Sequence, residues 1–148
     1  MRLLRWLRSL FGASNDAESQ LVPPGDGHFV YIKIPESIGP MARGSKYEDP
    51  IAAKLESRNL GEITGGGSQL GHAAEDGTRP IEFCGIDVDI ASLDEGLTLL
   101  RDALLELEAP VGTELHYDEG GAKLQDELSP TGWLLKRPRS FIHPGFGV

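Results

Sequence analysis

Apolar residues recur with two different periods along the middle of the chain. In residues 29–34 every second side chain is aliphatic, which is typical of a strand with one buried face. Residues 62–70, 81–90 and 114–117 also have strand character, although the first of these segments is rich in glycine. Residues 71–80 have the composition of a turn. The pattern therefore predicts four strands.

The third predicted strand contains a shift in its apolar period. Two apolar residues precede the shift at odd positions, Ile81 and Phe83. Three follow it at even positions, Ile86, Val88 and Ile90. A β-bulge at Cys84–Gly85 would return all of them to one buried face, and we therefore expect a bulge there.

Two helices are expected to connect these strands. The first should begin with Asp49 as the N-cap and Pro50 at the first helical position, and should end near Asn59. The second begins with a capping box formed by Ser92 and Glu95. Its apolar face is a set of leucines spaced by four and three residues, Leu93, Leu97, Leu100, Leu104 and Leu107.

The resulting order of elements, βαββαβ over residues 28–118, resembles the ferredoxin-like superfold in its topology. The resemblance implies an α+β domain with a four-stranded antiparallel sheet and two helices on one face. Residues 119–148 then form a C-terminal extension that packs on the domain, by adding a strand or covering an edge. We also expect strands one, two and four to run in one direction, which would bring the segments that follow them to a common rim.

The first eleven residues differ from the rest of the chain in pattern and charge. Their apolar side chains share one side of a helix, Leu3, Leu4, Trp6, Leu7, Leu10 and Phe11, while the other side carries Arg2, Arg5, Arg8 and Ser9. Because arginines interrupt the apolar residues at every third position, we do not expect a secretory signal peptide. Residues 1–11 therefore predict a basic amphipathic helix, followed by a linker at 12–27. Two alternatives stay open: a helix that contacts a membrane surface or a partner, and a helix that packs on its own domain.

The charge of the chain narrows the choice of partner. Lys and Arg total 14 against 23 Asp and Glu, a net charge of -9. Because phosphate binding needs a basic surface, this balance disfavours nucleic acid and favours a protein partner. Cys84 is the only cysteine, which excludes an intramolecular disulfide and fits a cytoplasmic protein. No run reaches the roughly 18 apolar residues of a membrane-spanning helix, so we expect a soluble or peripheral protein.

Residues 61–71 contain five glycines. A Walker loop requires a lysine after its last glycine, and none follows here. A dinucleotide fingerprint must open a helix, whereas this run precedes turn residues and another strand. We therefore expect no nucleotide and no other cofactor. A bent strand is the simpler interpretation, and backbone recognition of a ligand is the alternative.

The expected rim carries the first set of candidate binding residues. The segment 35–48 is long for a connection between a strand and a helix, which favours a functional role. The candidates from this loop, the glycine run and the next loop are Arg43, Lys46, Tyr47, Gly65, Gly66, Gly67, Ser68, His72 and Arg79. Their cations can bind an anion or a partner's carboxylates, or can balance acidic neighbours within the chain.

The polar face of the sheet carries the second set, Glu62, Asp87, Asp89 and His116. Two carboxylates at positions i and i+2 of a strand point the same way and can contribute to a metal or acid–base site, although a solvated surface is the simpler interpretation. Cys84 lies in an apolar strand and the four histidines show no metal-ligand spacing. We therefore nominate no catalytic residue and no metal site.

These features favour a non-enzymatic, acidic module that binds or regulates a protein partner. A neutraliser of a basic partner, such as an immunity-type protein, is one example. The alternative is a small enzyme or ligand sensor with an anion-binding rim around Arg43, Lys46, Gly66 and His72. A homodimer in which two open sheet faces pack together is a third hypothesis.

Overall fold

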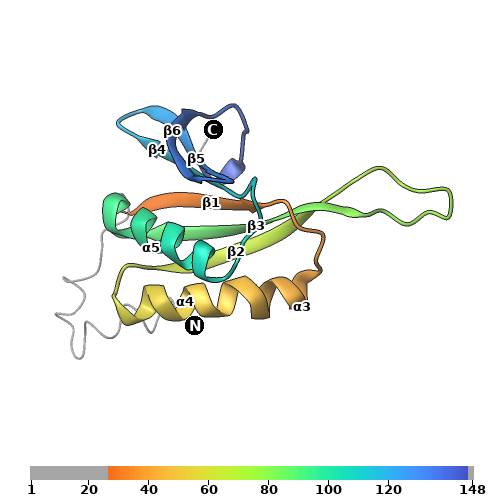
Figure 1. The fold of residues 1–148 in the computed structure, drawn as a ribbon, viewed down its shortest axis with the longest axis horizontal. Helices are drawn as coiled ribbons and strands as arrows, with labels where there is room; N and C mark the ends of the chain where they lie inside the picture. The colour runs from red at the N-terminus through yellow and green to blue at the C-terminus, as the bar shows by residue number, and fades with distance from the viewer. Residues whose placement is uncertain (1–26, 147–148) are drawn as a thin grey trace.

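Six strands form a single antiparallel sheet in the computed structural model, which describes residues 27–146 (Figure 1). The strands are β1 (His28–Ile34), β2 (Gly61–Leu70), β3 (Ile81–Ile90), β4 (Glu114–Glu119), β5 (Ala122–Ser129) and β6 (Gly132–Pro138), arranged in the order β2-β3-β1-β4-β5-β6. The predicted four-stranded sheet is therefore wrong. Residues 122–138, which the sequence placed in a C-terminal extension, continue the same sheet as a hairpin, and the fold remains α+β.

Strand directions correct the predicted rim. β1 and β2 are each antiparallel to β3, so they run in the same direction and the segments that follow them lie at one end of the sheet. β4 is antiparallel to β1, which means that the chain leaves β4 at the opposite end. The prediction that strand four runs with strands one and two is wrong.

One helical segment precedes β2 and consists of α3 (Pro40–Arg43), a π-helical turn η1 (Gly44–Glu48) and α4 (Asp49–Ser57). The sequence placed residues 35–48 in a loop and Asp49 at a helix start. This is wrong for residues 40–48, because Glu48 already has helical angles of φ -64 and ψ -47. Asn59, with φ 55, follows the last turn where the sequence placed the helix end.

Four buried side chains of this segment recur at every fourth position, Arg43, Tyr47, Ile51 and Leu55, and Ala52 is buried beside them. The stripe therefore starts one turn earlier than the apolar pattern indicated, because its first member is charged.

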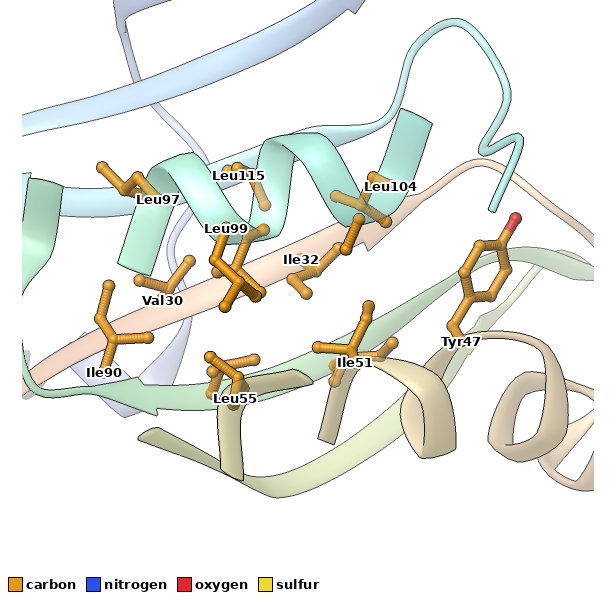
Figure 2. Close-up of a cluster of buried hydrophobic side chains, with 14 of the residues drawn as sticks. Val30, Ile32, Tyr47, Ile51, Leu55, Ile90, Leu97, Leu99, Leu104 and Leu115 are labelled. Atoms are coloured by element: carbon orange, nitrogen blue, oxygen red, sulfur yellow. The ribbon is translucent and has the colours of Figure 1, made fainter. Parts of the chain in front are cut away.

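The second helix, α5 (Leu93–Glu106), forms as predicted, and the Ser92 side chain accepts a hydrogen bond from the backbone N–H of Glu95 at 3.4 Å. Both helices cover one face of the sheet (Figure 1). Figure 2 shows their apolar side chains meeting those of the central strands, Val30, Ile32, Tyr47, Ile51, Leu55, Ile90, Leu97, Leu99, Leu104 and Leu115. We call the opposite face of the sheet the outer face.

The pairing of β3 with β1 is uninterrupted from Cys84 to Ile90, so the predicted bulge at Cys84–Gly85 is wrong. Irregularities occur instead in the pairing of β2 with β3, between Ile63 and Gly65 and between Gln69 and Leu70. Without a bulge, Phe83 lies on the outer face, and its neighbour Cys84 is buried on the helix face. The apolar period shifts because β3 makes apolar contacts on both of its faces.

The predicted amphipathic helix at 1–11 lies outside the described residues, as does nearly all of the linker. Within residues 27–146 no helix is long and apolar enough to cross a membrane.

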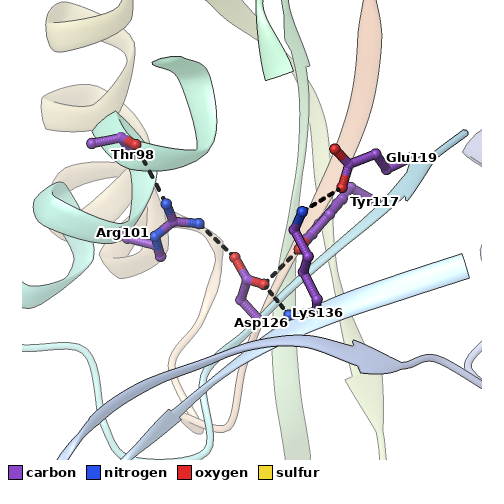
Figure 3. A network of polar contacts seen from close by, with 6 residues as sticks. All are labelled: Thr98, Arg101, Tyr117, Glu119, Asp126 and Lys136. Carbon is purple, nitrogen blue, oxygen red and sulfur yellow. Dashed lines mark hydrogen bonds and ion pairs between the residues drawn. The ribbon is translucent and has the colours of Figure 1, made fainter. Parts of the chain in front are cut away.

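A buried carboxylate joins the β5–β6 hairpin to the rest of the fold (Figure 3). Asp126 is 0% exposed and accepts hydrogen bonds from Arg101 Nη1 at 2.7 Å, Tyr117 Oη at 2.6 Å and the backbone N–H of Lys136 at 3.0 Å. Burial and the bond to Asp126 raise the pKa of Tyr117, which stays a neutral donor. Because a buried carboxylate is costly without donors, these contacts specify how β5 and β6 sit against α5 and β4.

Replacing Asp126 with Ala should lower the free energy of unfolding by about 3–5 kcal/mol, because Arg101 and the Tyr117 hydroxyl would lose their buried acceptor. Lys136→Ala is the matched control, since this residue contacts Asp126 only through its backbone and its side chain pairs with Glu119 at an exposed site. It should change stability by less than about 0.5 kcal/mol. Urea denaturation measures both, and equal values for the two variants would contradict the role of Asp126.

Candidate functional site

The glycine run forms most of β2, which is an edge strand of the sheet. Gly65 pairs with Asp87 and Gly67 with Gly85, so these residues lie together on the outer face. We call Gly65, Gly67 and Gly85 the glycine window, because none has a side chain. Position 85 requires glycine, since a Cβ there would overlap the ring of Tyr31. The ring of Tyr31 covers Gly85, while Gly65 and Gly67 carry no side chain between that ring and the sheet edge.

Carboxylates lie beside the glycine run on both faces of β2. On the outer face, a Cβ at Gly65 would lie 3.2 Å from Asp87 Oδ2. On the helix face, a Cβ at Gly66 would lie 2.8 Å from Glu48 Oε2 and 3.1 Å from the carbonyl oxygen of Gly85, so a side chain does not fit there without a shift. Larger residues at Gly65 and Gly66 would therefore contact these two carboxylates, of which Glu48 is paired with Arg43.

Arg43 is the predicted rim residue that reaches the glycine run. Its Nη1 donates to Ser68 Oγ at 3.3 Å, and its Nε lies 3.3 Å from the position of a Cβ on Gly66. The same guanidinium forms an ion pair with Glu48 at 2.6 Å and is only 9% exposed. Its charge is therefore already balanced within the protein.

The other predicted rim residues lie apart from Arg43. Lys46 forms an ion pair with Glu36 at 2.8 Å, and the Tyr47 hydroxyl donates to the same carboxylate. Burial alone would raise the pKa of Glu36, but the hydrogen bonds from Lys46 and Tyr47 hold it below its ordinary value. His72 is exposed in the β2–β3 connection, where Arg79 donates to the Gly71 carbonyl at 2.8 Å. The cations thus do not converge on one anion site.

The predicted acidic face divides into two parts. Glu62 lies opposite Asp89, and Asp87 is two residues further along the same face of β3. Burial and the charge of Asp87 raise the pKa of Asp89. His116 lies on β4, with β1 between it and these carboxylates, and its buried Nε2 donates to Glu114 at 2.7 Å. Residues 27–146 contain no group of three side chains suited to hold a metal ion.

Residues 139–146, which we call the C-terminal segment, follow β6 and cover much of the outer face. Phe141 stacks on Tyr31 with ring centroids 5.6 Å apart and planes 3° apart. It also contacts the rings of His116 and Phe83 at 5.3 and 6.2 Å. The expected open, solvated face is therefore wrong, and the face-to-face homodimer would require a surface that this segment occupies.

Arg139 attaches the C-terminal segment to the sheet. Its Nη1 donates to the carbonyl oxygen of Tyr117 at 2.6 Å, and its Nη2 pairs with Asp118 at 2.7 Å. The guanidinium also lies 3.9 Å from the ring centroid of Phe146, which packs edge-on against Phe29. These contacts fix both ends of the segment.

A hollow of about 340 Å³ lies between the C-terminal segment and β2. Tyr31, Phe83 and Asp87 line it from the central strands, Gly66–Gln69 line it from β2, and Phe141–Pro144 line it from the C-terminal segment. It combines a carboxylate, a phenol and aromatic rings beside an uncovered sheet edge. We take the hollow and the adjoining edge of β2 as the candidate functional site.

The histidine and the cysteine closest to this site are not placed as a free base or a free nucleophile. His143 Nδ1 accepts from the backbone N–H of Gly145 at 2.8 Å, so its Nε2 carries the proton and faces Asp87 Oδ1 at 3.3 Å. With both nitrogens engaged, this histidine has no free base. Cys84 is fully buried on the helix face, and burial raises the pKa of its thiol, which disfavours a nucleophilic thiolate.

Sequence reasoning did not identify Arg139, Phe141 and His143 as site residues. The one signal for them was the concentration of apolar residues at 141–146, which predicts burial but not the surface that is covered. Asp87 and the glycines were identified, although on two separate surfaces.

No match to this chain is found among models of protein families, curated proteins or solved structures.

Replacing Arg139 with Ala should lower the free energy of unfolding by about 2–3 kcal/mol, because buried acceptors lose a charged donor. Arg137→Ala is the matched control, since Arg137 is exposed on the same strand end. It should change stability by less than about 0.5 kcal/mol. Chemical denaturation measures the stability of both variants. The near-ultraviolet circular dichroism of the outer-face aromatic residues should change only for Arg139→Ala. Identical behaviour of the two variants would show that Arg139 does not anchor the segment.

Proposed function

We propose that the protein is an acidic binding module that takes up an extended, basic segment of a partner protein as an added strand along β2. The observation that carries the proposal is the contrast between the two edges of the sheet. One edge is blocked against strand addition and the other is open.

The β6 edge has the features that natural proteins use to prevent pairing. It ends in Lys136, Arg137 and Pro138, its pairing with β5 is irregular, and Lys136 has a left-handed backbone with φ 56. In β2, by contrast, the eight residues from Ile63 to Leu70 include no charged residue and no proline. Residues 66–70 are all exposed. The backbone groups on the free side of β2 are thus accessible to an extended peptide.

The charge of the protein supports a basic occupant. The chain has a net charge of -9, and the carboxylate of Asp87 lies on the outer face of the glycine run, whereas Glu48 on the helix face is already paired with Arg43. A basic side chain on the outer face of an added strand would approach Asp87, and the long-range field would accelerate the encounter.

The geometry gives less support to an enzyme or an anion sensor. Arg43 and Lys46 are each paired with a glutamate, and His72 lies away from them in the β2–β3 connection. An anion would have to displace these internal partners before it could bind.

A displayed library of random short peptides tests the proposal directly. Bound peptides should be extended and enriched in Lys or Arg, and they should protect backbone amides of residues 64–69 from hydrogen exchange. Methylating alternate backbone nitrogens of a bound peptide should weaken binding by about tenfold or more, because each methyl group removes a donor to the edge.

Gly67→Lys should weaken the same peptides by about tenfold, since a lysine on an edge strand opposes further pairing. The residue has open space for a side chain, so the variant should fold normally. Gly39→Lys is the matched control, because it adds the same charge at another open position on the surface. Peptides that are acidic, that protect other residues, or that bind both variants equally would overturn strand addition at β2.

A further inference from the structure

We infer that the hollow beside the glycine window is a binding subsite for a cationic side chain, an ammonium or guanidinium group, of the segment bound along β2. The inference rests on the proposed function and specifies the chemistry of its ligand. It is carried by one carboxylate, one unpartnered hydroxyl, two aromatic rings and the space left by the glycines.

Asp87 provides the negative charge of the subsite. Its side chain is 28% exposed, and its Oδ1 is 3.3 Å from His143 Nε2 while its Oδ2 faces the glycine window. Because Gly145 donates to the other nitrogen of His143, the imidazole approaches Asp87 as a neutral donor. One oxygen of the carboxylate is therefore left toward the site, and Asp89 lies on the same face of β3.

Tyr31 provides a polar group that has no partner within residues 27–146. The residue is 7% exposed, and it lines the hollow. Burial and the charge of Asp87 raise the pKa of Tyr31 to about 12, so the phenol is neutral at physiological pH. The hydroxyl is not one of the described polar atoms that are buried without a hydrogen-bond partner, so it is accessible from the hollow, where an N–H donor of a ligand can bind its oxygen.

The aromatic rings of the hollow already stabilise one cation. Lys33 Nζ lies 4.6 Å from the ring centroid of Phe83 and 5.4 Å from that of Phe141. Lys33 lies over two of the lining rings but does not itself line the hollow, and among the described residues Asp87 is paired with His143 and with no lysine or arginine. This combination favours an organic cation and disfavours an anion.

The glycine window explains how a side chain from the edge would reach Asp87. A strand added to β2 would lie roughly 10 Å from β3, because neighbouring strands are about 4.8 Å apart. A side chain on the outer face of the added strand must therefore cross β2. Gly65 and Gly67 leave that path free, and a lysine or arginine is long enough to use it.

Peptides selected on the wild-type protein provide the probe, with each Lys or Arg replaced in turn by norleucine, which keeps the apolar stem without the charge. One replacement should weaken binding by about tenfold, and the others by less than about threefold. Asp87→Asn should lose this difference, while Asp89→Asn should retain it as the matched control on the same strand and face. Asp87→Asn can still accept from His143, so the C-terminal segment should stay in place.

The outcomes separate this inference from the proposed function. If peptides protect residues 64–69 but no single cation matters more than the others, or if Asp87→Asn and Asp89→Asn behave alike, the subsite is wrong and strand addition stands. If the selected peptides are anionic and Asp87→Asn changes their affinity, the hollow binds the opposite charge and the inference is overturned. If no peptide protects β2, both proposals fail.

Discussion

The buried carboxylate of Asp126 determines where the second half of the sheet lies. It accepts from α5, from β4 and from the backbone of β6, so it joins three elements across the helix face of the sheet. The C-terminal segment begins one residue after β6, and Arg139 attaches it to the outer face. The shape of the candidate site on one face of the sheet thus depends on a polar contact on the other, because both are reached through the same hairpin.

A sheet with helices on one side needs other material on the second side wherever that side is apolar. β1 and β3 place Phe29, Tyr31 and Phe83 on the outer face, and the C-terminal segment covers these rings with Phe141 and Phe146. The cover stops short of the free edge of β2, where glycines leave no apolar side chain to bury. The hollow lies at the border between the covered and the bare part of the face.

Strong local patterns could be interpreted correctly from the sequence, and patterns altered by tertiary contacts could not. The alternation of β1, the glycine strand and the cap of α5 at Ser92 were predictable because each signal is local. Helix α3 was missed because its inward position carries Arg43, and β5 because its inward position carries Asp126. A buried charge is indistinguishable from a surface residue until its partners are known. The site combines β2, β3 and a segment more than fifty residues away, and no local period encodes that proximity.

The blocked edge at β6 also limits how copies of this protein can join. Head-to-tail growth would require β2 of one molecule to pair with β6 of the next, and the cations, proline and left-handed residue at the end of β6 oppose that contact. A heterologous contact must repeat from molecule to molecule to build a filament, so these features of β6 disfavour an extended cross-β filament that grows through the two edges. An exposed, uncharged strand such as β2 is an aggregation hazard in a sheet that is open at both edges, and the features of β6 reduce that hazard for head-to-tail contacts.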